Sequence, residues 1–342
     1  MTIAVGCVLL VGIVLYGVFG GADFGAGLWD LTAGGAHRGK RARDLIDHAI
    51  GPVWEANHTW LIFCLVILWS GFPTAFAAIV TTLYIPLGIS VLGIVLRGSG
   101  FAFRKVLTGS LGRQINSVAF AMPSVITPFG FGTVAGGIAS GRVPSDGYGD
   151  PVTSWLNPTS LLGGVLAVMT CSYLAALFLT EEGRHAGAPD LVAWAHRRAI
   201  LAAGAAGIVA LAGLFVLHED ARRLFDRLTA PALPLVLVSA VAGLAALAAT
   251  MSLADRWRWR PVRGLGALAV AAILAGWGVG QYPYLLGDHL TISDAAAPPQ
   301  TMDSLIVVAG LAAVFVVPPL AWLLLLTQRG ELSDPDATSP RR

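Results

Sequence analysis

Long apolar runs dominate this 342-residue chain and restrict it to a membrane fold. An α-helix needs about 20 mostly apolar residues to cross the hydrocarbon core of a bilayer, and nine segments meet that length. Only 12% of the residues are charged, against about 25% in a typical soluble domain. We therefore predict an all-α, polytopic membrane protein with nine transmembrane helices, over roughly 3–29, 50–70, 74–96, 117–138, 159–180, 199–217, 231–253, 264–286 and 303–326.

Basic residues alternate between the connecting segments and give the predicted orientation. Loops on the cytoplasmic side of a membrane carry an excess of Lys and Arg. With the N-terminus outside and the C-terminus cytoplasmic, 18 of the 22 basic residues fall on the inner side. The first 19 residues lack a basic start and a cleavage site, so we expect a retained first span. The whole of 1–330 is predicted as one integral membrane domain, followed by a polar cytoplasmic tail at 331–342.

Two carboxylates lie inside segments that otherwise read as lipid-embedded helix. Asp23 lies near the inner end of the first predicted span, and Glu55 lies near the inner start of the second. Antiparallel neighbouring helices would bring the two acids together, with His58 on the face of Glu55, Asn57 beside it and Trp54 flanking the group. A charge inside the bilayer is costly and is by default a functional-site hypothesis. We expect a proton relay here, and the alternative is a polar contact that only fixes helix packing.

Two arginines follow the third predicted span, in the segment RGSGFAFR at 97–104. Long basic side chains at a helix end often extend toward the aqueous interface, and this is one interpretation of Arg97 and Arg104. The sharper interpretation is a pair of cations at the inner mouth, close to Asp23 and Glu55.

Metal, heme and nucleic-acid binding by this chain are not expected. Glu55 and His58, and also Glu182 and His185, have the Glu-x-x-His spacing of a di-iron bundle. Such a site needs two further Glu in the membrane, and the chain has only five Glu in all. Heme ligation is equally unexpected, because His58 is the one histidine clearly inside a predicted span. The net charge of +2 argues against a nucleic-acid partner. The cysteines show no metal or redox spacing and are interpreted as small apolar side chains: Cys7, Cys64 and Cys171.

Three segments in this order resemble one family. They are GADFGAGLWDL at 21–31, IGPVWEANHTWLI at 50–62 and RGSGFAFR at 97–104. Together they are similar to subunit II of the cytochrome bd quinol oxidases, including the cyanide-insensitive branch, and the likeness extends over essentially the whole chain. One position departs from the family pattern, since Ala102 stands where an acid is usual. No role is carried over to that position.

The resemblance implies a fold and a role in a larger complex. Each large subunit of that family has two four-helix bundles and one peripheral helix. Subunit I carries two hemes b, the heme d and the quinol-oxidising loop. Subunit II ligates no heme and contributes to a proton path from the cytoplasm, on which Glu55 and Asp23 would lie. Small single-helix accessory subunits, membrane lipid, a structural quinone or a phospholipid also accompany some members, which reside in the bacterial cytoplasmic membrane.

Two rival functions have to be weighed against a subunit of an electrogenic quinol oxidase. A proton-coupled secondary transporter could use the same acids, although such proteins often place polar groups at the midplane of both halves. In this chain Asp23 and Glu55 both lie in the first half and near the same membrane face. This arrangement favours a path for proton access over the alternating-access site of a transporter. A purely structural scaffold would tolerate the change Glu55→Gln.

Overall fold

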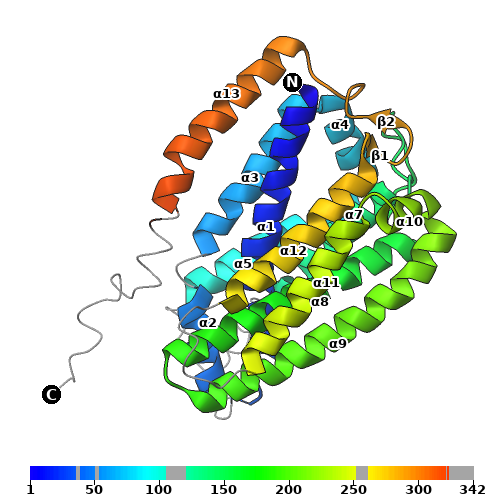
Figure 1. Cartoon of the computed structure of the whole chain (residues 1–342). Helices are drawn as coiled ribbons and strands as arrows, with labels where there is room; N and C mark the ends of the chain where they lie inside the picture. The colour runs from blue at the N-terminus through cyan, green and yellow to red at the C-terminus, as the bar shows by residue number, and fades with distance from the viewer. Residues whose placement is uncertain (36–38, 51–53, 105–120, 252–260, 321, 323–342) are drawn as a thin grey trace.

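A computed structural model describes residues 1–35, 39–50, 54–104, 121–251, 261–320 and 322, and it is almost entirely helical (Figure 1). Side chains are not described at 50, 54–56, 101–104 and 261. The helices are α1 (Thr2–Leu31), α2 (Lys40–Ile50), α3 (Trp54–Gly71), α4 (Pro73–Thr82), α5 (Tyr84–Arg104), α7 (Pro123–Ala139), α8 (Pro158–His185), α9 (Pro189–Asp220), α10 (Arg222–Thr229), α11 (Leu233–Met251), α12 (Pro261–Gln281) and α13 (Pro299–Phe315). A short antiparallel hairpin, β1 (Tyr284–Leu286) and β2 (Leu290–Thr291), precedes α13.

Six helices are long and apolar enough to cross a membrane: α1, α8, α9, α11, α12 and the stretch Pro299–Leu320 that begins with α13. A seventh crossing results if the bent pair α3 and α4 is counted as one span. The chain is thus an all-α, multi-pass membrane protein. The count of nine spans, the grouping into two four-helix bundles and the orientation stay predictions.

The third predicted span, 74–96, is wrong as a single helix. A break at Leu83 separates α4 from α5 within this range, and a turn of 117° between α3 and α4 precedes it. Proline explains both breaks, because it has no amide hydrogen and its ring clashes with the carbonyl four residues earlier. Pro73 opens α4, and Pro86 would collide with the carbonyl of Thr82, where α4 ends.

Other boundaries also differ from the predicted ones. Helix α9 begins at Pro189 rather than near residue 199, and α12 ends at Gln281, two residues before Pro283, rather than at 286. Two amphipathic helices, α2 and α10, occupy segments that were expected to be loops. The predicted helix residues 51–53, 117–120, 252–253, 321 and 323–326, and the predicted tail 331–342, lie outside the described part of the chain.

Helix α1 lies at the centre of the packing and contacts α3, α7, α8 and α12. Glycine permits the closest approach, since a Cβ atom at Gly25 would collide with the backbone carbonyl of Cys171 in α8. Helices α7 and α8 meet in the same way, because a Cβ at Gly132 would collide with the carbonyl of Gly163. Small residues allow backbones to pack this closely in membrane helices. The close packing fixes the position of the polar side chains on α1.

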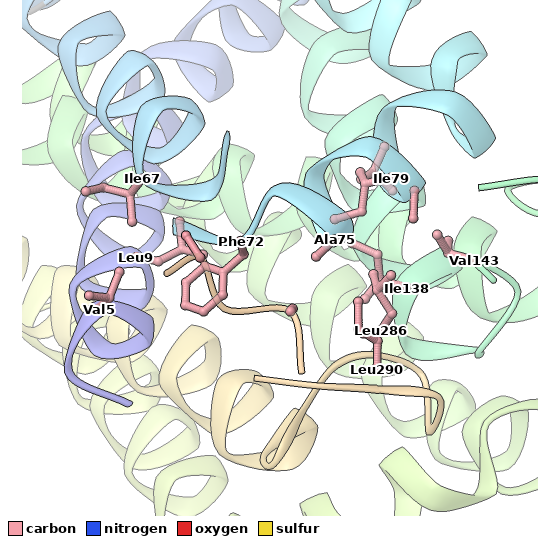
Figure 2. Packing of buried hydrophobic residues seen from close by; sticks show 14 of the residues in the cluster. Val5, Leu9, Ile67, Phe72, Ala75, Ile79, Ile138, Val143, Leu286 and Leu290 are labelled. Atoms are coloured by element: carbon pink, nitrogen blue, oxygen red, sulfur yellow. The ribbon is translucent and has the colours of Figure 1, made fainter. Parts of the chain in front are cut away.

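The N-terminus, α4, the hairpin and the start of α13 meet at one end of the helices, whereas α2 lies at the opposite end (Figure 1). We call these the hairpin end and the α2 end. Figure 2 shows the apolar cluster that fills the hairpin end, where Leu9 of α1 and Ile67 of α3 approach Phe72 at the bend. Ile138 of α7 and Leu286 of β1 continue the same cluster. If the N-terminus is outside, this cluster closes the outer face of the protein.

Candidate functional site

The candidate site is built around Asp23, which α1 carries into the interior of the protein. Its side chain is only 3% exposed. The glycines that flank it in GGADFGAG bring neighbouring helices close, and a Cβ at Gly27 would collide with the side chain of Ser124 in α7. Asp23 is therefore enclosed by protein. A buried carboxylate requires a compensating partner nearby.

Arg97 of α5 supplies that partner, and its side chain is fully buried. Its Nη2 lies 2.5 Å from Oδ1 of Asp23 and donates at 2.9 Å to the backbone carbonyl of the same residue. Its Nη1 donates to the hydroxyl of Ser124. The guanidinium also stands over the ring of Phe24, 5.0 Å from its centre. One arginine thus joins α1, α5 and α7 at a single buried ion pair.

The burial of Arg97 argues against a side chain that extends to the aqueous interface. Such a side chain would be partly exposed, whereas that of Arg97 has 0% exposure. Arg97 instead contacts Asp23. Whether it acts at a mouth stays a prediction. Arg104 ends α5, but its side chain lies outside the described residues.

Helix α3 brings two further predicted residues to this ion pair. Asn57 is buried, and its side-chain amide lies beside the carboxylate of Asp23. His58 is half-buried and within electrostatic range of the same group. Helix α3 begins at Trp54, so Glu55 lies in its first turn, but the side chains of both residues are outside the described part. The pairing of α1 with α3 therefore brings Asn57 and His58 close to Asp23, and the approach of Glu55 to Asp23 stays a prediction.

A second group of charged residues lies at the α2 end. Asp30, in the last turn of α1, is fully buried and lies 3.1 Å from Nε of Arg43 in α2. The sequence analysis did not single out Asp30, which stands at the edge of an apolar run. The signal that could have found it is its spacing of seven residues from Asp23, which places both on one face of a helix.

A histidine and carboxylate cluster lies beside this pair, between α2, α8 and α12. Arg263 donates to Glu182 at 2.7 Å, and His185 lies 3.9 Å from the same carboxylate. His185 also lies 3.8 Å from the buried Glu181, and His48 lies 4.0 Å from Glu182. Within the described ranges, no three His, Cys, Asp or Glu side chains are arranged to hold a metal ion. These contacts join three helices at the α2 end.

The sequence and the fold can now be compared with those of known proteins. The sequence profile of the family described as cytochrome bd terminal oxidase subunit II matches residues 1–327. Over 177 residues the chain is 30% identical to the protein of Bacillus subtilis (strain 168) named cytochrome bd ubiquinol oxidase subunit 2, covering 50% of this chain and 51% of that protein. Over 169 residues it is 28% identical to the protein of Escherichia coli (strain K12) named cytochrome bd-I ubiquinol oxidase subunit 2, covering 47% and 44%.

Each of these alignments spans only about half the length of the curated relative. A solved structure covers more of the chain. It is described as the structure of bd oxidase from Geobacillus thermodenitrificans, and one of its chains superposes with a TM-score of 0.78 at 24% identity. That superposition covers 94% of this chain and 97% of the other. At this level of identity the likeness establishes the fold.

Proposed function

Because the chain belongs to the cytochrome bd terminal oxidase subunit II family, we propose that it is the heme-free subunit II of a quinol:oxygen oxidoreductase. In this proposal it supports a heme-bearing subunit I, which holds two hemes b and one heme d. The complex oxidises quinol and reduces oxygen to water in the bacterial cytoplasmic membrane. The family match over residues 1–327 is the observation that carries the proposal.

The chain's own contribution is a proton path that enters from the cytoplasm. Glu55 and Asp23 carry the protons, and Trp54, Asn57 and His58 shape the path. Support comes from the buried position of Asp23 and from the approach of Asn57 and His58 to its carboxylate. The first turn of α3 also starts one residue before Glu55. Arg97 and Arg104 belong to the inner end of this path, with Arg97 held on Asp23.

The ion pair gives this path a polar interior without a net charge. An isolated ion in the bilayer is strongly disfavoured, whereas an aspartate and an arginine in contact compensate each other. The hydrogen-bond donors and acceptors that this pair holds in place can orient a hydrogen-bonded chain for proton transfer beside Glu55. Uptake from one side makes the reaction electrogenic, since one elementary charge moved across 100 mV is worth about 2.3 kcal/mol.

The rival function, a proton-coupled transporter, is less well supported by the distribution of buried charge. Among the described residues, the buried charged side chains are Asp23, Asp30, Arg97 and Glu181, on α1, α5 and α8. Transporters of repeat architecture place their sites at the interface of two similar halves. Charges gathered on the first helices and near the α2 end fit a path that leads to a neighbouring subunit.

Glu55→Gln in the purified complex tests the proposed function. We expect a heme d band in the preparation, nearly unchanged heme content in the variant, and oxygen consumption slowed roughly tenfold or more, as for loss of a proton-transfer group. Glu219→Gln is the matched control, because Glu219 lies exposed at the end of α9 beside His218. That control should consume oxygen at the normal rate.

Each contrary result has a defined meaning. Normal turnover in Glu55→Gln would exclude the relay and leave a structural scaffold. Absence of heme from an intact, purified complex would exclude the oxidase and favour the transporter. Slow turnover with lost heme would assign Glu55 to assembly.

A further inference from the structure

A second buried carboxylate lies on the same face of α1 as Asp23. Asp30 follows it by seven residues, which is about two helical turns and about 10.5 Å along the axis at 1.5 Å per residue. Its side chain has 0% exposure, like that of Arg97. Asp30 is the nearer of the two acids to the α2 end, where α1 finishes at Leu31. The two acids therefore form a line along α1 from the α2 end into the protein.

The local field at Asp30 is unfavourable for an anion. The carboxyl end of a helix carries the negative pole of its dipole, and Asp30 lies in the last turn of α1. Arg43 compensates, with its Nε 3.1 Å from Oδ1 of Asp30. Fixing α2 in place does not require this acid. Leu45 and Ile46 pack α2 into an apolar cluster, and Arg41 forms an ion pair with Asp190 of α9.

A hydroxyl group lies between the two acids. Gly27, four residues after Asp23 and three before Asp30, leaves room for Ser124, whose side chain would collide with a Cβ there. Ser124 accepts a hydrogen bond from Arg97, which also binds Asp23. A hydroxyl both donates and accepts, so it can take up one proton while releasing its own. The surface of α1 between the acids is thus lined by a group able to carry protons.

Arg43 connects Asp30 with the surface. Its side chain is 23% exposed, whereas that of Asp30 is fully buried. Its guanidinium also donates to the carbonyl of Gly34, in the turn after α1. Arg43 therefore covers Asp30 on the side that faces water and remains the part of this pair that solvent reaches.

We propose that Asp30, buried under Arg43 and aligned with Asp23 along α1, is an entry station for protons into this subunit. The Asp30 carboxylate takes a proton from water at the α2 end and releases it toward Ser124 and Asp23. It returns to the carboxylate form, and Arg43 stays protonated throughout. This inference rests on the proposed function and adds the step by which protons reach its path.

The test uses the whole complex and compares three variants. Asp30→Asn should slow oxygen consumption roughly tenfold, with heme content and thermal midpoint close to those of the unchanged complex, and it should alter the dependence of turnover on pH. Asp30→Glu keeps a carboxylate and should restore more than half of the rate. Arg43→Gln keeps the acid but leaves it without its cation, so it should lower the thermal midpoint and slow turnover less than Asp30→Asn does. Arg41→Gln breaks the other ion pair of α2 and serves as the control.

Each remaining outcome overturns the inference. Normal turnover in Asp30→Asn would do so, and so would an equal loss in Asp30→Asn and Arg43→Gln, because the pair would then only hold α2. Loss of the hemes in Asp30→Asn would assign the acid to folding. Glu55→Gln measured in parallel separates the two proposals. If that variant is slow and Asp30→Asn is normal, only the entry station fails, and if both are normal, the path itself fails.

Discussion

Two arginine–aspartate pairs in this protein use the same groups in opposite ways. At the hairpin end, Asp220 accepts from both terminal nitrogens of Arg142, at 2.6 and 3.1 Å, and from the amide and hydroxyl of Thr159, at 3.1 and 2.6 Å. In the interior, Asp23 is bound by Arg97 through one oxygen. The other oxygen has no hydrogen bond of ordinary geometry among the described residues, although Asn57 lies close by.

The difference indicates what each pair is built to do. Both oxygens of the Asp220 carboxylate accept hydrogen bonds, and the pair ties the end of α7 to α8 and α9. Arg142 and Asp220 are also partly exposed, at 34% and 16%, so solvent weakens their attraction. The interior pair is shielded from water, and Arg97 binds only one oxygen of the Asp23 carboxylate. A fully bonded carboxylate stabilises helix ends, whereas one held on a single side can also interact with a mobile proton.

The largest expected effect comes from breaking the interior pair. Arg97→Gln leaves Asp23 buried without its cation, and removing one partner of a buried pair typically costs about 3–5 kcal/mol. We expect a marked fall in the thermal midpoint and in the yield of assembled complex. The double variant Asp23→Asn with Arg97→Gln should recover part of that loss, because it leaves no unpaired charge. A midpoint within a degree of the unchanged protein in Arg97→Gln would contradict the assignment.

An intermediate effect is expected from closing the space beside the interior pair. Gly27→Ala places a methyl group against Ser124, and overpacking of this kind costs about 1–3 kcal/mol. Displacement of Ser124 should also slow oxygen consumption. Gly6→Ala, on the same helix, is the matched control, since its Cβ would meet Ile292 at an ordinary 3.8 Å. Equal midpoints and rates for the two variants would show that Ser124 is not held against α1.

The smallest effect is expected from the exterior pair. Arg142→Gln should lower stability by about 1 kcal/mol, because the pair is partly solvated and Thr159 still binds Asp220. Oxygen consumption should stay at the normal rate, measured beside the thermal midpoint in detergent. If Arg142→Gln proved as damaging as Arg97→Gln, the contrast between the two pairs would be lost.

Much of the fold follows from sequence because hydropathy and proline act locally. The apolar runs predict helices at nearly the observed places, and in the structure Asn57 and His58 of the PVWEANH segment lie near Asp23. Pro86 could have predicted the break after Thr82. The apolar run continues across this break, however, and therefore suggested a single helix. Arg97 was harder, since a basic residue after an apolar run usually marks the interface. Its burial depends on Asp23, 74 residues away in the chain, which no local pattern contains.

The same limit applies to the arginines of the hairpin end. The count of basic residues placed four arginines on the outer side, although Lys and Arg usually concentrate in cytoplasmic loops. The structure gives each a partner, as Arg222 bonds Asp226, Arg142 bonds Asp220, and Arg223 and Arg227 donate to backbone carbonyls of 281–287. These arginines bind local carboxylates and carbonyl oxygens and so hold the loops of the hairpin end in place. Such pairings come from tertiary contacts, so composition alone could not distinguish them from orientation signals.

The apolar cluster around Phe72 acts as an electrical insulator. Its buried members span α1, α3, α4 and the hairpin, so an ion pushed toward Asp23 from that side would have to give up its hydration shell with nothing polar in exchange. On the proposed path, protons would therefore enter from the α2 end or from a neighbouring subunit rather than through this cluster. In the proposed function, a membrane voltage would then not be dissipated by ions crossing this cluster.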